Sequence, residues 1–188
     1  MMKLAIRAIL VSLGFLLAVS GEAPAADSKL MFTGVVDSVT DGGLIRVILN
    51  EGQKIQSPYN TCSKVYSTMA WVRLYAVHAP DPVKRELCGK EAKEFLKNMA
   101  QGKSVKVEII GCPPNGGVTG VVMVDDGFTA SRDASLELIK AGLSKVAIPG
   151  ASTDPSKLTG KYFEAEKSAM MEGRGIWGKK KCSGIAKR

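Results

Sequence analysis

The sequence has little of what a metal centre requires. It contains one histidine, His78, and its four cysteines include no Cys-x-x-Cys pair. Structural zinc sites are usually built from such pairs and from histidines, so a zinc site has poor support. No internal repeat is visible either, and the length of 188 residues indicates one domain with modest appendages.

Long apolar runs are also missing. The longest candidate, Ala8–Val19, is too short to span a bilayer comfortably. Lys3 and Arg7 flank its start, and small residues follow it at 23–26. A charged start, a short apolar core and an Ala-x-Ala exit are typical of a cleavable secretory signal. We therefore expect residues 1–26 to be removed and the mature chain to be periplasmic or secreted, without a transmembrane span.

Two alternatives bear on this N-terminal segment. An uncleaved N-terminal anchor is the alternative to a cleaved signal. A lipoprotein is not expected, because no cysteine stands at the predicted cleavage site.

Basic residues exceed acidic ones, and the formal net charge is +8. Lys3, Arg7 and Glu22 carry +1 of this charge, which leaves +7 on the predicted mature chain. A basic surface favours nucleic acid, anionic lipid headgroups or acidic polymers. Many exported proteins are basic without binding a polyanion, so charge alone leaves the partner open.

The cysteines Cys62, Cys88, Cys112 and Cys182 are even in number, which in an exported chain favours two disulfides. Four cysteines allow three pairings. Of these we favour Cys88 with Cys112 and Cys62 with Cys182.

Short strand patterns and turn signals alternate along the chain. Residues 31–39 and 44–49 flank Thr40-Asp41-Gly42-Gly43, which predicts a β-hairpin. A polar loop at 51–70 follows. Three further strands are predicted at 71–77, 104–110 and 118–124, an extended segment at 143–148, and helices at 89–99, at 134–141 and from Asp154-Pro155 to about residue 171.

Five short strands with one helix between the third and the fourth predict a five-stranded Greek-key OB barrel. With three helices the fold class is α+β, mainly β. The predicted domain spans 27–178, and the remaining residues 179–188 form a basic C-terminal tail.

Five stretches carry a family signature. They are Gly34–Gly42, Val72–Asp81, Cys88–Ala92, Leu138–Ala147 and Gly173–Trp177. In their order and spacing they resemble the staphylococcal nuclease (thermonuclease) family, and together they cover most of residues 31–178. The resemblance implies an OB barrel, and it implies an origin among proteins that cleave phosphodiesters with the help of calcium.

The residues that the family uses for this chemistry are mostly replaced. The resemblance implies a carboxylate cluster for calcium, a glutamate beside the attacking water and two arginines that clamp the phosphate. Gly43 and His78 stand at two of the calcium-ligand positions, and the shorter Asp81 stands at the glutamate position. Arg73 retains one arginine, whereas Val118 replaces the other.

These replacements predict the loss of calcium-dependent cleavage. Losing one clamping donor costs about 3 kcal/mol of barrier, or about a hundredfold in rate. Without two carboxylates, ordinary calcium affinity should also disappear. The tyrosine of the family's nucleotide pocket is Ile148 here. We therefore regard Arg73 and Asp81 as remnants of a catalytic site, and we expect no cofactor and no calcium.

A transition metal is the alternative at this place. An imidazole in place of a carboxylate shifts the preference of a metal site from calcium towards transition metals. Asp41 and His78, together with Asp81, are therefore candidate ligands of zinc or manganese. The structural interpretation is that Asp41 serves the turn and that His78 is exposed. Arg73 would then be a buried donor to backbone carbonyls or to Asp81.

Three functions remain open from the sequence. We favour a non-catalytic module, expected to be a monomer, that binds nucleic acid, another polyanion or a protein partner. A nuclease acting on DNA or RNA through an altered metal site is the second hypothesis. The third is a structural envelope protein whose barrel supports the insertion at 51–70. Trp71 and Trp177 are expected in the core rather than stacked on bases.

Overall fold

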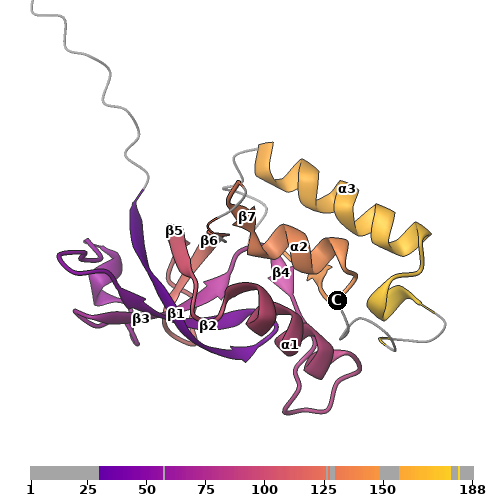
Figure 1. The fold of residues 1–188 in the computed structure, drawn as a ribbon, viewed down its shortest axis with the longest axis horizontal. Helices are drawn as coiled ribbons and strands as arrows, with labels where there is room; N and C mark the ends of the chain where they lie inside the picture. The colour runs from indigo at the N-terminus through magenta and orange to yellow at the C-terminus, as the bar shows by residue number, and fades with distance from the viewer. Residues whose placement is uncertain are drawn as a thin grey trace, which may run out of the picture.

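A computed structural model describes residues 30–56, 58–125, 127, 130–148, 157–178 and 182 (Figure 1). The predicted signal 1–26, the helix start at Asp154-Pro155 and the basic run Lys179–Lys181 lie outside these residues. None of the helices within the described ranges is long and apolar enough to cross a bilayer.

The five predicted barrel strands and the three predicted helices are present in the predicted order, with shifts at their ends, and three further strands of two residues each are found. The strands are β1 (Met31–Asp41), β2 (Leu44–Leu49), β3 (Met69–Leu74), β4 (Val77–His78), β5 (Ser104–Gly111), β6 (Val118–Val124), β7 (Arg132–Asp133) and β8 (Lys145–Val146). The helices are α1 (Gly89–Ala100), α2 (Ala134–Lys140) and α3 (Lys157–Met171), with 3-10 turns η1 (Tyr59–Thr61) and η2 (Gly175–Trp177).

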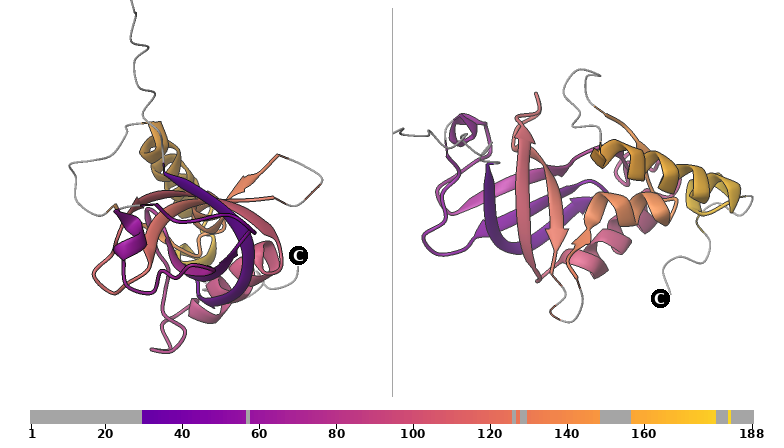
Figure 2. Two further views of the ribbon diagram at one scale, coloured as in Figure 1. Left: turned by 90° about the vertical axis from the view of Figure 1, so that its left-hand side faces the viewer. Right: turned by 90° about the horizontal axis from the view of Figure 1, so that it is seen from above.

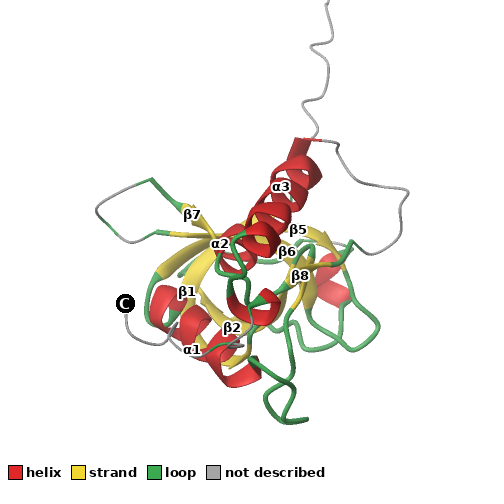
Figure 3. Cartoon of the chain, turned by 90° about the vertical axis from the view of Figure 1, so that its right-hand side faces the viewer, coloured by secondary structure: helices red, strands yellow, loops and turns green. Residues whose placement is uncertain are grey.

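Five of these strands close into the predicted barrel. The strands run in the order β3-β2-β1-β5-β6 with antiparallel neighbours. A parallel pairing of β3 with β6, from Val72 opposite Val118 to Leu74 opposite Gly120, joins the two edges. Figure 2 shows the strands wrapped around the barrel, and Figures 2 and 3 show the helices gathered at one end of it.

Alternate residues of each barrel strand fill the interior. Inward-facing side chains from all five barrel strands are at most 1% exposed: Phe32, Val36, Ile45, Val47, Val72, Val107 and Val122. Helix α1 covers one opening with the apolar face formed by Ala92, Leu96 and Met99, which repeat at helical spacing. The core is therefore built by period-two strands and one amphipathic helix.

The predicted third strand, 71–77, is interrupted in the structure. Ala76 has a φ of 60°, a left-handed conformation that is unfavourable for a residue with a side chain. Two backbone hydrogen bonds hold the turn, from Tyr75 N to Gly120 O and from Ala147 N to Ala76 O. The chain leaves the barrel here, and β4 pairs with β8 instead.

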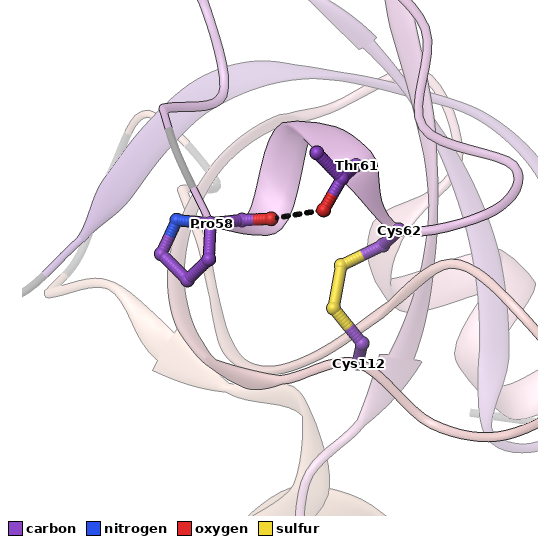
Figure 4. Close-up of a disulfide and its surroundings, with 4 residues drawn as sticks. All are labelled: Pro58, Thr61, Cys62 and Cys112. Carbon is purple, nitrogen blue, oxygen red and sulfur yellow. Dashed lines mark hydrogen bonds between the residues drawn. A yellow bond between two sulfur atoms is a disulfide. The ribbon is translucent and has the colours of Figure 1, made fainter.

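The favoured disulfide pairing was wrong. The structure joins Cys62 to Cys112 and Cys88 to Cys182, with Cα atoms 5.8 Å and 5.4 Å apart. Figure 4 shows the first bond just after η1, whose Thr61 hydroxyl donates to the Pro58 carbonyl.

Tertiary contacts explain this pairing. Gly117 N donates to Ser63 O, so the loop after η1 lies against the turn that contains Cys112. Cys88 is the N-cap of α1, and the end of the chain returns to it. Neither approach could be predicted from local sequence patterns, because both join segments that are remote along the chain.

Asp133 connects three elements at the helical end of the barrel. It is the last residue of β7 and the N-cap of α2, and it is 5% exposed. Its carboxylate accepts hydrogen bonds from Leu136 N at 3.2 Å, Lys161 Nζ at 2.7 Å and Tyr162 Oη at 2.8 Å. Burial, together with the neighbouring Asp133 carboxylate, raises the pKa of the Tyr162 hydroxyl, which therefore remains a donor. Helix α3 is thus held to α2 by one buried carboxylate.

Replacing this carboxylate should destabilise the domain. Asp133→Ala leaves the Tyr162 hydroxyl and the Lys161 ammonium without their acceptor, and we expect a loss of about 3–5 kcal/mol in the free energy of unfolding. Urea unfolding followed by circular dichroism measures it. Asp125→Ala is the matched control, because Asp125 is exposed and its carboxylate accepts a hydrogen bond from Gly127 N at the surface. Equal losses in the two variants would contradict the central role of Asp133.

The disulfide pairing can be tested directly. Non-reducing digestion and mass spectrometry should give peptides that link Cys62 to Cys112 and Cys88 to Cys182, with no free thiol. Replacing both cysteines of one pair by alanine should lower the free energy of unfolding by about 2–5 kcal/mol. A peptide linking Cys88 to Cys112 would show that the structure pairs them incorrectly.

Candidate functional site

A groove of about 660 Å³ opens beside the turn between β3 and β4. Its walls come from the end of β3, the turn into β4, the segment after β5 and the start of β6. The residues that line it are Arg73, Leu74, Tyr75, Ala76, Val77, His78, Ile110, Gly111, Cys112, Pro113, Pro114, Asn115, Thr119 and Ala147. They include one permanent cation and, among the described residues, no carboxylate.

Arg73 brings the positive charge to this groove. It lies between Leu44 of β2 and Thr119 of β6 in the sheet register. Its Nε is buried and has no hydrogen-bond partner among the described residues, so the expected bond to a carbonyl or to Asp81 is absent for this atom. An unpaired buried donor costs about 1–3 kcal/mol, and the guanidinium is free to receive an anion.

Asp81 does not face Arg73. Its Oδ1 accepts hydrogen bonds from Val83 N at 2.8 Å and from Lys84 N at 3.3 Å, and its Oδ2 lies 3.9 Å from Lys84 Nζ. The carboxylate therefore caps the turn that follows it and does not line the groove. In this conformation it is poorly placed to activate water beside Arg73.

The hairpin turn between β1 and β2 contacts the segment that follows β4. A Cβ atom on Gly42 would lie 2.7 Å from the Cβ atoms of Ala79 and Ala92, so the turn packs closely on this segment. Asp41 Oδ1 accepts a hydrogen bond from Gly43 N at 2.7 Å, which is the turn role expected for it. A Cβ on Gly43 would meet only Asp41 Oδ1 at 3.7 Å and Val77 Cγ2 at 3.8 Å, so an aspartate fits there.

His78 is exposed and pairs with Lys145 across the β4–β8 ladder. Within the described ranges, no three His, Cys, Asp or Glu side chains are grouped closely enough to hold a metal ion. The structure therefore does not gather Asp41, His78 and Asp81 into one cluster. Metal binding by Asp41 and His78 stays a prediction for titration to decide.

Val118 stands at the position that the resemblance assigns to the second clamping arginine. Val118 is fully buried in the core, whereas its neighbour Thr119 lines the groove opposite Arg73. Strand alternation could have shown this, since Val118 continues the buried pattern of β6 and Thr119 points away from it. Asn115 and Tyr75 also line the groove and carried no signal in the sequence.

Known proteins share this part of the chain. Residues 71–179, which carry Arg73, His78 and Asp81 but not Asp41, match the family described as Staphylococcal nuclease homologue. The chain belongs to this family. A curated relative of the staphylococcal nuclease homologues, the Probable endonuclease LCL3 of Pyricularia oryzae, is 32% identical over 113 residues. The match covers 58% of this chain and 44% of that relative, so the chain spans less than half of the relative's length.

Restoring carboxylates should create calcium affinity. Gly43→Asp with His78→Asp restores carboxylates at two positions that the resemblance assigns to calcium ligands, and a Cβ has room at position 43. We expect calorimetry to show calcium binding by this double variant and none by the wild type. Asn98→Asp with Gln101→Glu is the control, because both residues are exposed and the added charge is equal. Calcium binding by the wild type, or equal binding by the control, would contradict the assignment.

Proposed function

We propose that this staphylococcal nuclease homologue is a non-catalytic module that binds nucleic acid in the Arg73 groove. The observation that carries the proposal is the groove's charge: Arg73 has an unpaired buried Nε, and no described lining residue is acidic. Such a groove attracts a phosphate but offers no oxygen cluster for a hard cation.

The surrounding residues also argue against the ancestral chemistry. A phosphodiesterase needs an acid or base near the attacking water and donors for the developing charge. Asp81 is engaged with Val83 N and Lys84 N, and Val118 is buried in the core. Arg73 can then bind a phosphate, but neither Asp81 nor Val118 assists the cleavage of a phosphodiester.

A nuclease with altered chemistry is the second candidate. The relative that shares 32% identity is named a probable endonuclease, and His78 is an exposed imidazole at the edge of the groove. An imidazole can ligate a transition metal or move a proton. Binding of another polyanion or of a protein partner, and a structural role in the envelope, are the further outcomes that the experiments below separate.

We also infer that the domain works outside the cytosol. Two disulfides are typical of exported proteins, and the segment 1–26 has the pattern of a cleavable signal. N-terminal sequencing of the exported protein should find a start near Asp27.

Cleavage assays should separate binding from catalysis. We expect the purified domain to leave single-stranded DNA and RNA intact in calcium, magnesium, manganese or zinc, because the groove has no carboxylate cluster. Gel electrophoresis after long incubation measures it, with EDTA as the control. Cleavage that requires zinc or manganese and is lost in His78→Ala would favour the altered-metal nuclease instead.

Binding should depend on Arg73 and on salt. Arg73→Gln should weaken the binding of a single-stranded oligonucleotide about tenfold and lower the slope of log affinity against log salt by about one, because one phosphate contact is lost. Fluorescence anisotropy from about 50 to 200 mM salt measures both. Arg132→Gln is the matched control, since Arg132 pairs with Glu137 away from the groove. Absence of binding at low salt would exclude the proposal and favour a protein partner.

A further inference from the structure

A second pocket of about 290 Å³ adjoins the Arg73 groove. Its lining residues are His78, Pro80, Glu86, Leu87, Lys145, Ile176 and Trp177. His78 lines both hollows, so the groove and the pocket meet at this residue. Apart from His78, none of the catalytic and calcium-ligand positions compared above lines the second pocket.

The wall of this pocket is apolar and aromatic. Trp177, in η2, was expected in the core, but it is only partly buried and forms part of the lining together with Ile176. Leu87 also lines the pocket and is 55% exposed. A partly exposed aromatic ring and a leucine in the lining of a small hollow are suited to a flat, uncharged ring.

The charges around the pocket select which part of a nucleotide enters. Lys145 Nζ lies 5.5 Å from the centroid of the Trp177 ring, which places a cation at the wall. Glu86 Oε2 accepts a hydrogen bond from Asp81 N at 2.8 Å and keeps a carboxylate in the lining. The carboxylate repels a phosphate inside the pocket, whereas Lys145 attracts one at its edge. An uncharged base is therefore the part that fits inside.

We propose that the Trp177 pocket is a nucleobase subsite for a single strand whose phosphate lies on Arg73. The strand passes His78, its backbone contacts Lys145, and one unpaired base stacks on the face of the Trp177 ring that Lys145 does not cover. Stacking on an aromatic side chain recognises any base, so this subsite selects single-stranded over duplex nucleic acid rather than a sequence. The inference rests on the proposed function, since it assigns the base that accompanies the Arg73 phosphate.

Tryptophan emission gives a direct test. The sequence contains two tryptophans, Trp71 and Trp177, so a Trp71→Phe variant of the full mature chain reports on Trp177 alone. This variant is titrated with a thymidine oligomer of about eight nucleotides and with an abasic oligomer of equal length and charge. We expect the thymidine oligomer to quench the emission and to bind at least about fivefold more tightly, while the abasic oligomer binds without quenching.

A matched pair of variants in one loop supplies the control. Leu87→Ala removes a pocket residue and should reduce the advantage of the base-bearing oligomer at least about threefold. Val83→Ala changes a residue of the same loop that is 86% exposed and does not line the pocket, and it should leave the advantage unchanged.

The possible failures are distinguishable. If both oligomers bind equally, depend on Arg73 and leave Trp177 emission unchanged, the nucleobase subsite is excluded while the proposed function stands. If the two loop variants behave alike, the pocket is likewise excluded as the subsite. If neither oligomer binds at low salt, the proposed function fails and the subsite fails with it.

Discussion

The parallel pairing of β3 with β6 is the constraint on which the rest of this structure depends. It joins the two edges of the sheet and leaves the barrel without free strands at its seam. It also places Arg73 of β3 beside Thr119 of β6, at the wall of the groove. The chain must then leave the barrel abruptly, and Ala76 adopts its left-handed conformation to do so. The strand pairing that closes the barrel therefore also forms one wall of the groove.

The helices and the disulfides fix what surrounds this seam. Asp133 holds α3 to α2 through its bonds from Lys161 and Tyr162. The Cys62–Cys112 bond ties the loop after η1 to a groove wall, and the Cys88–Cys182 bond ties the chain end to the start of α1. Because each link joins distant segments, the groove has a wall with little freedom to collapse. A preformed groove lowers the entropy lost when a flexible strand binds.

The groove carries a cation and, among its described lining residues, no carboxylate. Asp81 faces its own turn, Asp41 serves the hairpin, and position 43 has no side chain. Beyond His78 lies a second hollow that carries an aromatic ring and a lysine. Under the proposed function, Arg73 would hold a phosphate and Trp177 a base, which is a physical basis for holding a strand without cutting it.

The sequence by itself determined the barrel, the three helices and the replaced catalytic positions, because strand periodicity, turn residues and family motifs are local along the chain. It also placed Asp41 in its turn correctly. Only the tertiary structure decided the disulfide partners and the orientation of Asp81. It also decided that Thr119 lines the groove while Val118 is buried, and that Trp177 is partly exposed in a pocket. Each of these depends on which remote segments meet when the barrel closes, and no local pattern of residues encodes such a meeting.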